Sequence, residues 1–326
     1  MLKFKLNTNR QTFNNRFATN ENLRFLSRTN PIQTRWQTFM NEQQRTSIEA
    51  LLLVNDLSLS NQKAILTELN SLLIECTQDL YDNGIKFEDA GLFEKLLFQI
   101  IFHNETLLTL TSGKLIEIRD KQLKINDLTA VYSIARLQIE TFINLSYIFF
   151  VDSEYSKEIR AYVYKIQGLR KQIELTKKHP KDFEPIKKMR NELAEELRKI
   201  RKLDEFKRVP FSKRKRFINP SYARLIKLDE IYPLIKIGNI SRTHSLYSNH
   251  IHSEYISIRQ LKSAVNDNSQ YESSFSTVTL LCSRITSLVI TNMVEQYELK
   301  NYSYSKAPLK LKKVIESINK LSSELK

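Results

Sequence analysis

Glycine and proline are scarce in this chain, and their scarcity constrains the fold more than any other feature. The 326 residues include 5 glycines and 7 prolines. Sandwiches and barrels of β-strands need many turns, and glycine and proline are among the residues that turns use most. The chain has little turn material for such folds and instead favours long helices joined by polar loops. We therefore predict an all-α helical bundle.

Apolar residues recur at spacings of three and four along most of the chain, as they do in helices with one buried face. The helices predicted in this way span residues 46–57, 61–81, 89–110, 127–151, 154–178, 181–203, 228–235, 241–265, 271–299 and 309–325. Between residues 111 and 126, apolar and polar residues alternate around a charged turn and predict a short β-hairpin. We expect the last helix to dock on the bundle rather than to bind a membrane.

Composition divides the chain into four regions. We predict a basic polar arm at residues 1–41, an N-terminal helical region at 42–126, a helical core at 127–299 and a C-terminal amphipathic helix at 300–326. The core contains an inserted basic helical hairpin at 153–220, whose two helices separate at His179-Pro180 because a proline disfavours helical geometry in the residue before it. The Arg–aromatic pairs of the arm suit contact with nucleic acid or packing on the protein itself, and no site is assigned there.

Positive charge is concentrated in the hairpin. The chain carries a formal net charge of +15, and residues 153–220 hold 21 Lys and Arg against 10 Asp and Glu, a net +11. Such a balance is expected of a protein that meets polyanions, and RNA or another nucleic acid is the first candidate partner. The alternative is a solvated hairpin whose charges keep the protein soluble. The predicted phosphate contacts form a basic loop made of Lys207, Arg208, Lys213, Arg214, Lys215 and Arg216.

The sequence predicts a cytoplasmic protein. Cys76 and Cys282 stand in apolar helical patterns without metal-ligand spacing, so we expect them to be reduced core residues. The longest apolar run, 142–151, is about half of what a bilayer requires, and the N-terminus lacks the apolar stretch of a secretory signal. We therefore expect no membrane partner.

Two predicted helices carry polar residues in regular order. Arg136, Glu140 and Asn144 follow one another at spacings of four and share one face of the largely apolar helix 127–151. Residues 241–253 contain three of the five histidines, and His244 and His252 lie eight residues apart with Ser248 midway between them. His250 lies about 200° around the helix from His252 and points elsewhere. The two helices could share one polar site.

No metal or cofactor is predicted at this site. His244 and His252 are separated by about 12 Å along a helix, too far for one ion to bind both. His250 and Glu254 have helical pair spacing but lack a third ligand at a recognisable spacing. The chain also lacks a Walker loop, a nucleophile elbow and a dinucleotide fingerprint.

The residue types instead suit metal-independent acid–base chemistry on a phosphodiester. A histidine transfers protons near neutral pH, and an arginine holds phosphate. We predict His252 as the general base or acid, Arg136 or Arg242 as the phosphate ligand and Glu140 as the residue that orients a basic partner. Ser248 and His244 complete the candidate set. The alternative is that these groups form a hydrogen-bonded buried network that fixes the register of the helices.

Two segments resemble a known family. Residues 134–148 contain Arg136, Glu140 and Asn144 and resemble the Arg-x-x-x-Glu-x-x-x-Asn helix of an uncharacterised bacterial helical family, and Ser248 with His252-Ser253 resembles its Ser-x-x-x-His-Ser element. That family is similar to HEPN proteins, the higher-eukaryote and prokaryote nucleotide-binding group. The resemblance covers residues 127–265 and implies a HEPN-like helical core. It also implies a homo-oligomer, because many HEPN proteins are RNA-cutting toxins or antiphage effectors that act as dimers.

The spacing departs from the usual HEPN nuclease motif, in which a histidine follows an arginine after four to six residues. Here Arg242 precedes His250 by eight positions and His252 by ten. Either Arg136 supplies the arginine from the neighbouring helix, or the domain only binds nucleotides or a partner. The sequence thus predicts an RNA-directed toxin or antiphage effector with a candidate ribonuclease site and a protein partner or neutralising factor. The alternatives are a noncatalytic nucleic-acid-binding or scaffolding subunit of a defence complex and a purely structural helical partner.

Overall fold

The computed structural model describes residues 42–82, 89–118, 121–176, 183–251, 255, 258–259, 268–299 and 302–324. The chain divides into two compact units, residues 1–49 and 50–326. The arm predicted for residues 1–41 lies outside the described residues.

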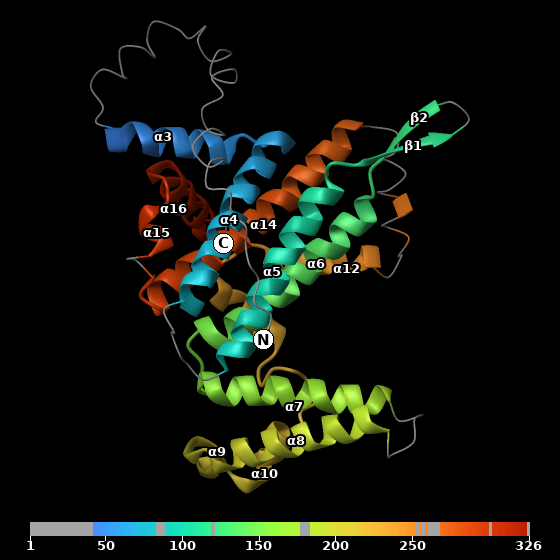
Figure 1. Cartoon of the computed structure of the whole chain (residues 1–326), viewed down its shortest axis with the longest axis vertical. Helices are drawn as coiled ribbons and strands as arrows, with labels where there is room; N and C mark the ends of the chain where they lie inside the picture. Colours follow the sequence, from blue (N-terminus) through green and yellow to red (C-terminus); the bar gives the residue numbers. More distant parts are fainter. Residues whose placement is uncertain are drawn as a thin grey trace, which may run out of the picture. The chain divides into compact units, whose positions relative to one another are not determined.

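The described residues are mostly helical, as predicted, and Figure 1 shows their arrangement. The elements are α3 (Glu42–Asn55), α4 (Leu59–Asp82), α5 (Ala90–Leu110), β1 (Lys114–Ile118), β2 (Lys121–Ile125), α6 (Leu128–Leu145), η2 (Ser146–Phe150), α7 (Lys157–Leu175), α8 (Glu184–Lys202), α9 (Asp204–Arg208), α10 (Phe211–Ile218), α11 (Leu228–Ile231), η3 (Tyr232–Ile235), α12 (Ile240–Ile251), α14 (Asn268–Gln296), α15 (Ser303–Lys306) and α16 (Leu309–Glu324). This is an all-α fold with one small β-hairpin, and β1 and β2 pair antiparallel with Lys114 opposite Ile125.

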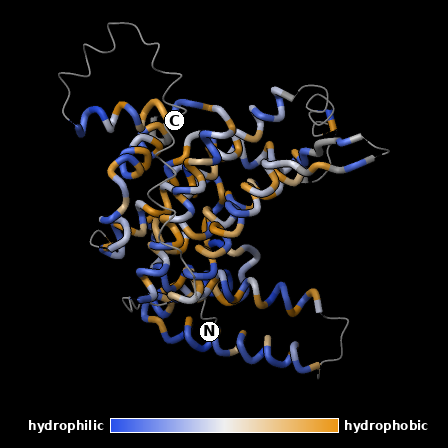
Figure 2. Tube along the Cα trace, turned by 45° about the horizontal axis from the view of Figure 1, so that its top comes forward, coloured by the Kyte–Doolittle hydropathy of each residue, from blue (hydrophilic) through white to orange (hydrophobic). Residues whose placement is uncertain are grey.

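The main core lies among α4, α5, α6 and α14, which pack on one another side by side (Figure 1). Figure 2 shows hydrophobic residues concentrated where these helices meet. The buried apolar residues of α4 and α14 follow helical spacing, as in Leu66, Leu69 and Leu73 or in Ile285, Val289 and Met293. Both cysteines are buried and free, as predicted, and burial raises the pKa of each thiol to about 12.

The longest core helix, α14, is as apolar as some membrane-spanning helices. By length and composition alone, Ser269–Gln296 could cross a bilayer, although 67% of its most apolar window is buried inside the protein. A core helix of a soluble protein passes the same test, so the absence of a membrane span remains a prediction. The C-terminal helix α16 docks on α14, with Leu311, Val314 and Ile318 buried between them.

Helix α6 begins at a capped residue and ends in a π-helical turn. The Asp127 side chain accepts a hydrogen bond from the Ala130 amide at 2.9 Å, which satisfies one of the free donors of the first turn. At the other end, the Val151 amide bonds the Ser146 carbonyl at 2.9 Å, a span of five residues. The sequence predicted one continuous helix over 127–151, but the last turn, η2, is wider and turns the buried Tyr147 into the protein.

The basic helical hairpin is present as predicted, and it has a core of its own. Helices α7 and α8 pack along each other and enclose a separate cluster of buried residues, Ile159, Tyr162, Val163, Ile166, Ile200, Phe206, Phe217 and Leu225. The outer helix, α8, is mostly hydrophilic (Figure 2). The hairpin thus has a thin apolar interior and a charged outer surface.

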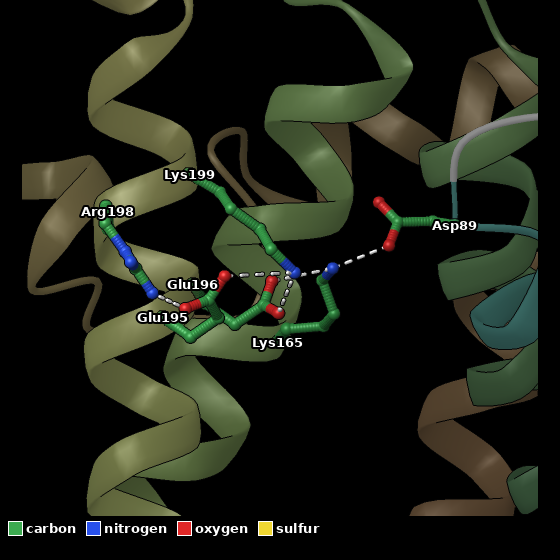
Figure 3. Close-up of polar contacts among 6 residues, drawn as sticks. All are labelled: Asp89, Lys165, Glu195, Glu196, Arg198 and Lys199. Carbon is green, nitrogen blue, oxygen red and sulfur yellow. Dashed lines mark hydrogen bonds and ion pairs between the residues drawn. The ribbon is translucent and has the colours of Figure 1, made fainter.

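Ion pairs join the hairpin to the main bundle. Lys165 of α7 lies between two carboxylates, with its Nζ 2.5 Å from Asp89 Oδ1 and 2.7 Å from Glu196 Oε2 (Figure 3). Asp89 precedes α5, and Glu196 belongs to α8. All three side chains are largely buried, so solvent screens their attraction less than it would at the surface. One lysine therefore connects three helical elements.

The predicted basic loop at residues 207–216 is wrong in its conformation. The segment forms two short helices, α9 and α10, with a bend at Val209-Pro210. Arg214 donates from Nε to the Val209 carbonyl at 2.9 Å and from Nη2 to the Lys207 carbonyl at 2.6 Å. Arg216 donates to the Leu225 carbonyl. The two arginines close these turns, which explains why a run that looks like a solvated loop in the sequence is ordered.

Candidate functional site

Helix α6 places three polar side chains along one side. Arg136, Glu140 and Asn144 are spaced by four residues and so lie above one another on the helix surface. Arg136 Nε donates to Glu140 Oε1 at 3.0 Å. This pair is partly open to solvent, with 20% of the arginine side chain and 39% of the glutamate side chain exposed. The charged face predicted from the sequence is therefore present and accessible.

Helix α12 brings one histidine to this face. His244 Nε2 lies 3.3 Å from Glu140 Oε1, and His244 Nδ1 lies 3.1 Å from the hydroxyl of Tyr232 in η3. The position of α12 on α6 is fixed further along the two helices, where the Tyr132 and Tyr247 rings stack at 4.8 Å and buried His250 meets Tyr132 edge-on at 4.3 Å. Packing of the two helices thus sets the contact between His244 and Glu140.

The two contacts of His244 define its tautomer when the ring is neutral. The hydrogen bond from His244, aided by Arg136, holds the pKa of Glu140 below its usual range, although burial acts against this. An ionised carboxylate can only accept, so Nε2 must carry the proton and Nδ1 accepts from the Tyr232 hydroxyl. Burial and the nearby Asp229 raise the pKa of Tyr232, which keeps that hydroxyl protonated. Proton donation therefore runs from Tyr232 to His244 to Glu140.

A second arginine enters from the segment between α10 and α11. Arg224 Nη1 donates to Asn144 Oδ1 at 2.7 Å, and the next residue, Leu225, donates its amide to the Tyr147 hydroxyl at 3.1 Å. Burial lowers the pKa of Arg224, while Glu140 and then Tyr232 act to raise it. We call the set Arg136, Glu140, Asn144, Arg224, Tyr232 and His244 the polar seam.

The polar seam contains three of the six candidate catalytic residues predicted from the sequence. Arg136, Glu140 and His244 belong to it, whereas Arg242 is exposed and has no hydrogen bond or ion pair with the described part of the chain. Ser248 is half-buried and is not hydrogen-bonded to the seam. His252, the predicted acid–base residue, lies outside the described residues. His250, which was predicted only to point away from the side of His252, is buried in the core.

Sequence reasoning missed Arg224 and Tyr232. Both stand in short, irregular segments, where no helical spacing relates them to Arg136 or Glu140. The one available signal was Tyr232-Pro233, a turn with an aromatic hydroxyl just before the histidine helix.

Neither a metal cluster nor the groove between α14, α15 and α16 coincides with the polar seam in the part of the chain that the structure describes. Within the described ranges, no three His, Cys, Asp or Glu side chains are grouped as metal ligands. A groove of about 420 Å³ lies elsewhere, between α14, α15 and α16, and contains neither histidine nor arginine. Its lining residues are Thr291, Val294, Glu295, Tyr304, Ser305 and Lys312. Comparisons with family models, curated proteins and solved structures found no match to this chain.

Proposed function

We propose that this protein is a metal-independent ribonuclease that acts through the polar seam, as an RNA-directed toxin or antiphage effector. The observation that carries the proposal is the position of His244 between the Glu140 carboxylate and the Tyr232 hydroxyl, with Arg136 and Arg224 beside them. A proton acceptor next to two guanidinium groups suits attack on a phosphodiester. The toxin or antiphage role is supported by the resemblance of residues 134–148 and 246–253 to a HEPN-like family.

Both ring nitrogens of His244 are occupied, so the group offered to the substrate is the Tyr232 hydroxyl. The 2′-hydroxyl of RNA gives its proton to the Tyr232 oxygen, while Tyr232 passes its own proton to His244 Nδ1. The 2′-oxygen then bonds to the adjacent phosphorus, and the bond from phosphorus to the 5′-oxygen breaks. The departing 5′-oxygen takes a proton from a water molecule, and the resulting hydroxide recovers the proton from His244 through Tyr232. The products are a 2′,3′-cyclic phosphate and a 5′-hydroxyl end, and the seam returns to its starting state.

The other seam residues stabilise charge during this step. His244 becomes an imidazolium, which the Glu140 carboxylate stabilises at 3.3 Å. Arg136 uses Nε for Glu140, and its terminal nitrogens make no hydrogen bond to the described residues, so they can face a phosphate. Arg224 is held by Asn144 through one nitrogen and can offer others. The alternative is that the seam only holds the helices in register, in which case it has no substrate.

Rates measured on folded protein separate the two functions. We expect labelled single-stranded RNA to be cut in the presence of EDTA to fragments with cyclic phosphate ends. His244→Ala and Tyr232→Phe should each reduce the rate by about 10²-fold or more. Ser245→Ala, an exposed change on α12 outside the seam, serves as the control. Thermal melting of each variant shows whether it is folded.

The cellular counterpart is induced expression of wild type and His244→Ala at matched soluble levels. Growth arrest with RNA fragmentation that the variant abolishes is the expected result. If folded His244→Ala cuts RNA as fast as wild type in vitro, the seam is structural and the proposed mechanism fails.

A second candidate is a noncatalytic nucleic-acid-binding or scaffolding subunit of a defence complex. The exposed basic residues of α9 and α10 favour it, because Arg208, Lys213 and Lys215 form no ion pair or hydrogen bond with an acidic residue in the described ranges. Lys213→Glu with Lys215→Glu should weaken RNA binding and reduce its dependence on salt. Unchanged affinity and an unchanged salt dependence in this variant would reject a binding role for α10.

A further inference from the structure

The most exposed large apolar side chain in the described ranges stands among positive charges. Phe211, the first residue of α10, is 87% exposed. A single exposed apolar side chain is ordinary on a protein surface, so the meaning of this ring depends on the side chains around it. Tyr222, which follows α10 in the chain, is 76% exposed. We propose that α10 is a platform on which the bases of single-stranded RNA stack, a proposal that rests on RNA being the substrate.

Helix α10 is held in place by its inward-facing residues. Phe217 is fully buried and meets Tyr155 edge-on at 5.2 Å and Phe206 at 6.0 Å. Arg214 bonds two carbonyls of the preceding turn, and its guanidinium lies over the Phe206 ring at 5.6 Å. A short helix fixed in this way presents its outer side chains at set positions, which reduces the entropy lost when a ligand binds.

The outer side chains combine a ring with free cations. Lys215 lies four residues after Phe211 and therefore on the same face of α10. Arg208 and Lys213 are exposed nearby in sequence, and no hydrogen bond or ion pair joins them to the described residues. Single-stranded nucleic acids bind to aromatic rings that stack with bases and to basic side chains that follow the phosphates. The platform offers both within one turn.

Two features select single strands over other polyanions. In a duplex the faces of the bases are already stacked, so Phe211 would have nothing to contact. An anionic membrane would instead need a broad apolar face. On α10 the apolar residues other than Phe211 turn inward, namely buried Phe217 and half-buried Ile218, and the exposed positions between them are polar or basic. The chemistry therefore fits exposed bases.

The platform is connected to the polar seam. Arg216 of α10 donates to the Leu225 carbonyl, and the preceding residue, Arg224, reaches Asn144 in the seam. Tyr222 lies within the few residues that join α10 to Arg224. A strand stacked on Phe211 and Tyr222 would thus be led along residues 219–224 toward His244. We infer that the platform feeds single-stranded RNA to the seam.

A single fluorescent reporter can test the contact directly. The chain has one tryptophan, Trp36, so Trp36→Phe with Phe211→Trp places the only indole on α10. The experiment uses the full-length chain carrying His244→Ala, which prevents cleavage. We expect a single-stranded 12-nucleotide RNA to quench this tryptophan, and the same RNA paired with its complement to quench it much less.

Affinity measurements provide the second arm. Phe211→Ala should weaken binding of the labelled single strand by about 5- to 150-fold, which corresponds to the loss of one stacked base. Leu175→Ala, at another exposed apolar position in the hairpin, is the matched control and should bind like the parent. Phe211→Tyr should restore most of the affinity.

Each outcome addresses one proposal. If Phe211→Ala binds as tightly as the parent, or if anionic phosphatidylserine vesicles and not RNA quench the reporter, the platform is wrong. Failure of the ribonuclease is seen separately, as wild type that leaves RNA intact. If wild type leaves RNA intact but binds single strands through Phe211, the proposed platform is supported and the proposed ribonuclease activity is rejected.

Discussion

Glu140 accepts hydrogen bonds from two neighbours in the polar seam, and both bonds favour its ionised form. His244 and Arg136 both bond its Oε1 atom, and the pKa of Glu140 is lowered as a result. The folded protein therefore binds a proton at Glu140 less readily than the unfolded chain does. Glu140 then contributes stability above the unfolded pKa of about 4.3, and this contribution is lost as pH falls through the lower folded pKa.

We predict that Glu140→Gln melts at a lower temperature than wild type at pH 7 and that the difference shrinks as pH falls below about 4.3, because a protonated Glu140 resembles glutamine. Melting curves between pH 3 and pH 8 measure the effect. Glu94→Gln, at an exposed position of α5, should melt like wild type throughout. A difference between Glu140→Gln and wild type that does not vary with pH would show that the Glu140 charge contributes nothing to folding.

At this scale the sequence predicts residues on regular helices and misses the others. Arg136 and Glu140 could be found because a spacing of four puts them on one face, and His244 because it begins a histidine-rich helix. Arg224 and Tyr232 reach the same place through a tertiary arrangement that no local pattern encodes. Arg242 lies outside the seam because its position on α12 points it to solvent.

The amphipathic pattern of helix α16 determines which of its side chains dock on the core. Leu311 is 3% exposed against the core, whereas Leu309 on the same helix is 45% exposed. We predict that Leu311→Ala lowers the free energy of unfolding by about 2–5 kcal/mol and Leu309→Ala by less than about 1 kcal/mol. Urea unfolding measures both, and equal effects would place α16 away from the core.

Lys165 makes one of the links between the hairpin and the bundle, beside Arg160 of α7, which donates to the Tyr147 and Val151 carbonyls. Lys165→Met should leave the largely buried Asp89 without its cation and Glu196 with Lys199 alone, a loss of roughly 1–3 kcal/mol. We expect amide hydrogen exchange in α8 to speed up by about 5- to 150-fold if the helix opens from that contact. Lys171→Met, at an exposed position of α7, is the control. Equal exchange in both variants would mean that the Lys165 ion pairs do not hold α8 in place.

Elements were predictable wherever periodicity was long. The helical hairpin and the β-hairpin follow from spacing and from the turn residues between their halves. Helix α10 was missed because its eight residues include four cations, which read as solvated chain. The order of this segment depends on Phe217 entering the hairpin core and on two arginines bonding carbonyls, and neither is a local signal.

Across the whole molecule, one hydrogen-bonded network passes through the core and ties four helices together. Asn104 of α5 donates to Asn70 of α4 and to Thr286 of α14, both at 2.9 Å, and accepts from Gln138 of α6 at 2.9 Å. All four side chains are buried. Buried polar groups must find partners, so this network favours one relative placement of the helices over others with equal apolar contact.

We predict that Asn104→Leu lowers the free energy of unfolding by at least about 2 kcal/mol, because several buried partners lose a hydrogen bond at once. The midpoint of urea unfolding measures the loss. Asn191→Leu, at an exposed position of α8, should leave the midpoint nearly unchanged. A similar shift in the two variants would show that apolar packing alone sets the arrangement.

The π-helical turn at the end of α6 has a consequence for how chains of this kind can vary in length. Arg224 and Leu225 are adjacent, and they bond residues on either side of the start of that turn, Asn144 and Tyr147. A descendant that lost residue 146 would regain an ordinary helix, yet Tyr147 would then follow Asn144 by two residues and not three, so Arg224 and Leu225 could no longer bond both. Such a deletion should be tolerated by the bundle and rejected by selection on the seam. The positions of deletions among diverging relatives would then reveal which lineages still use the seam.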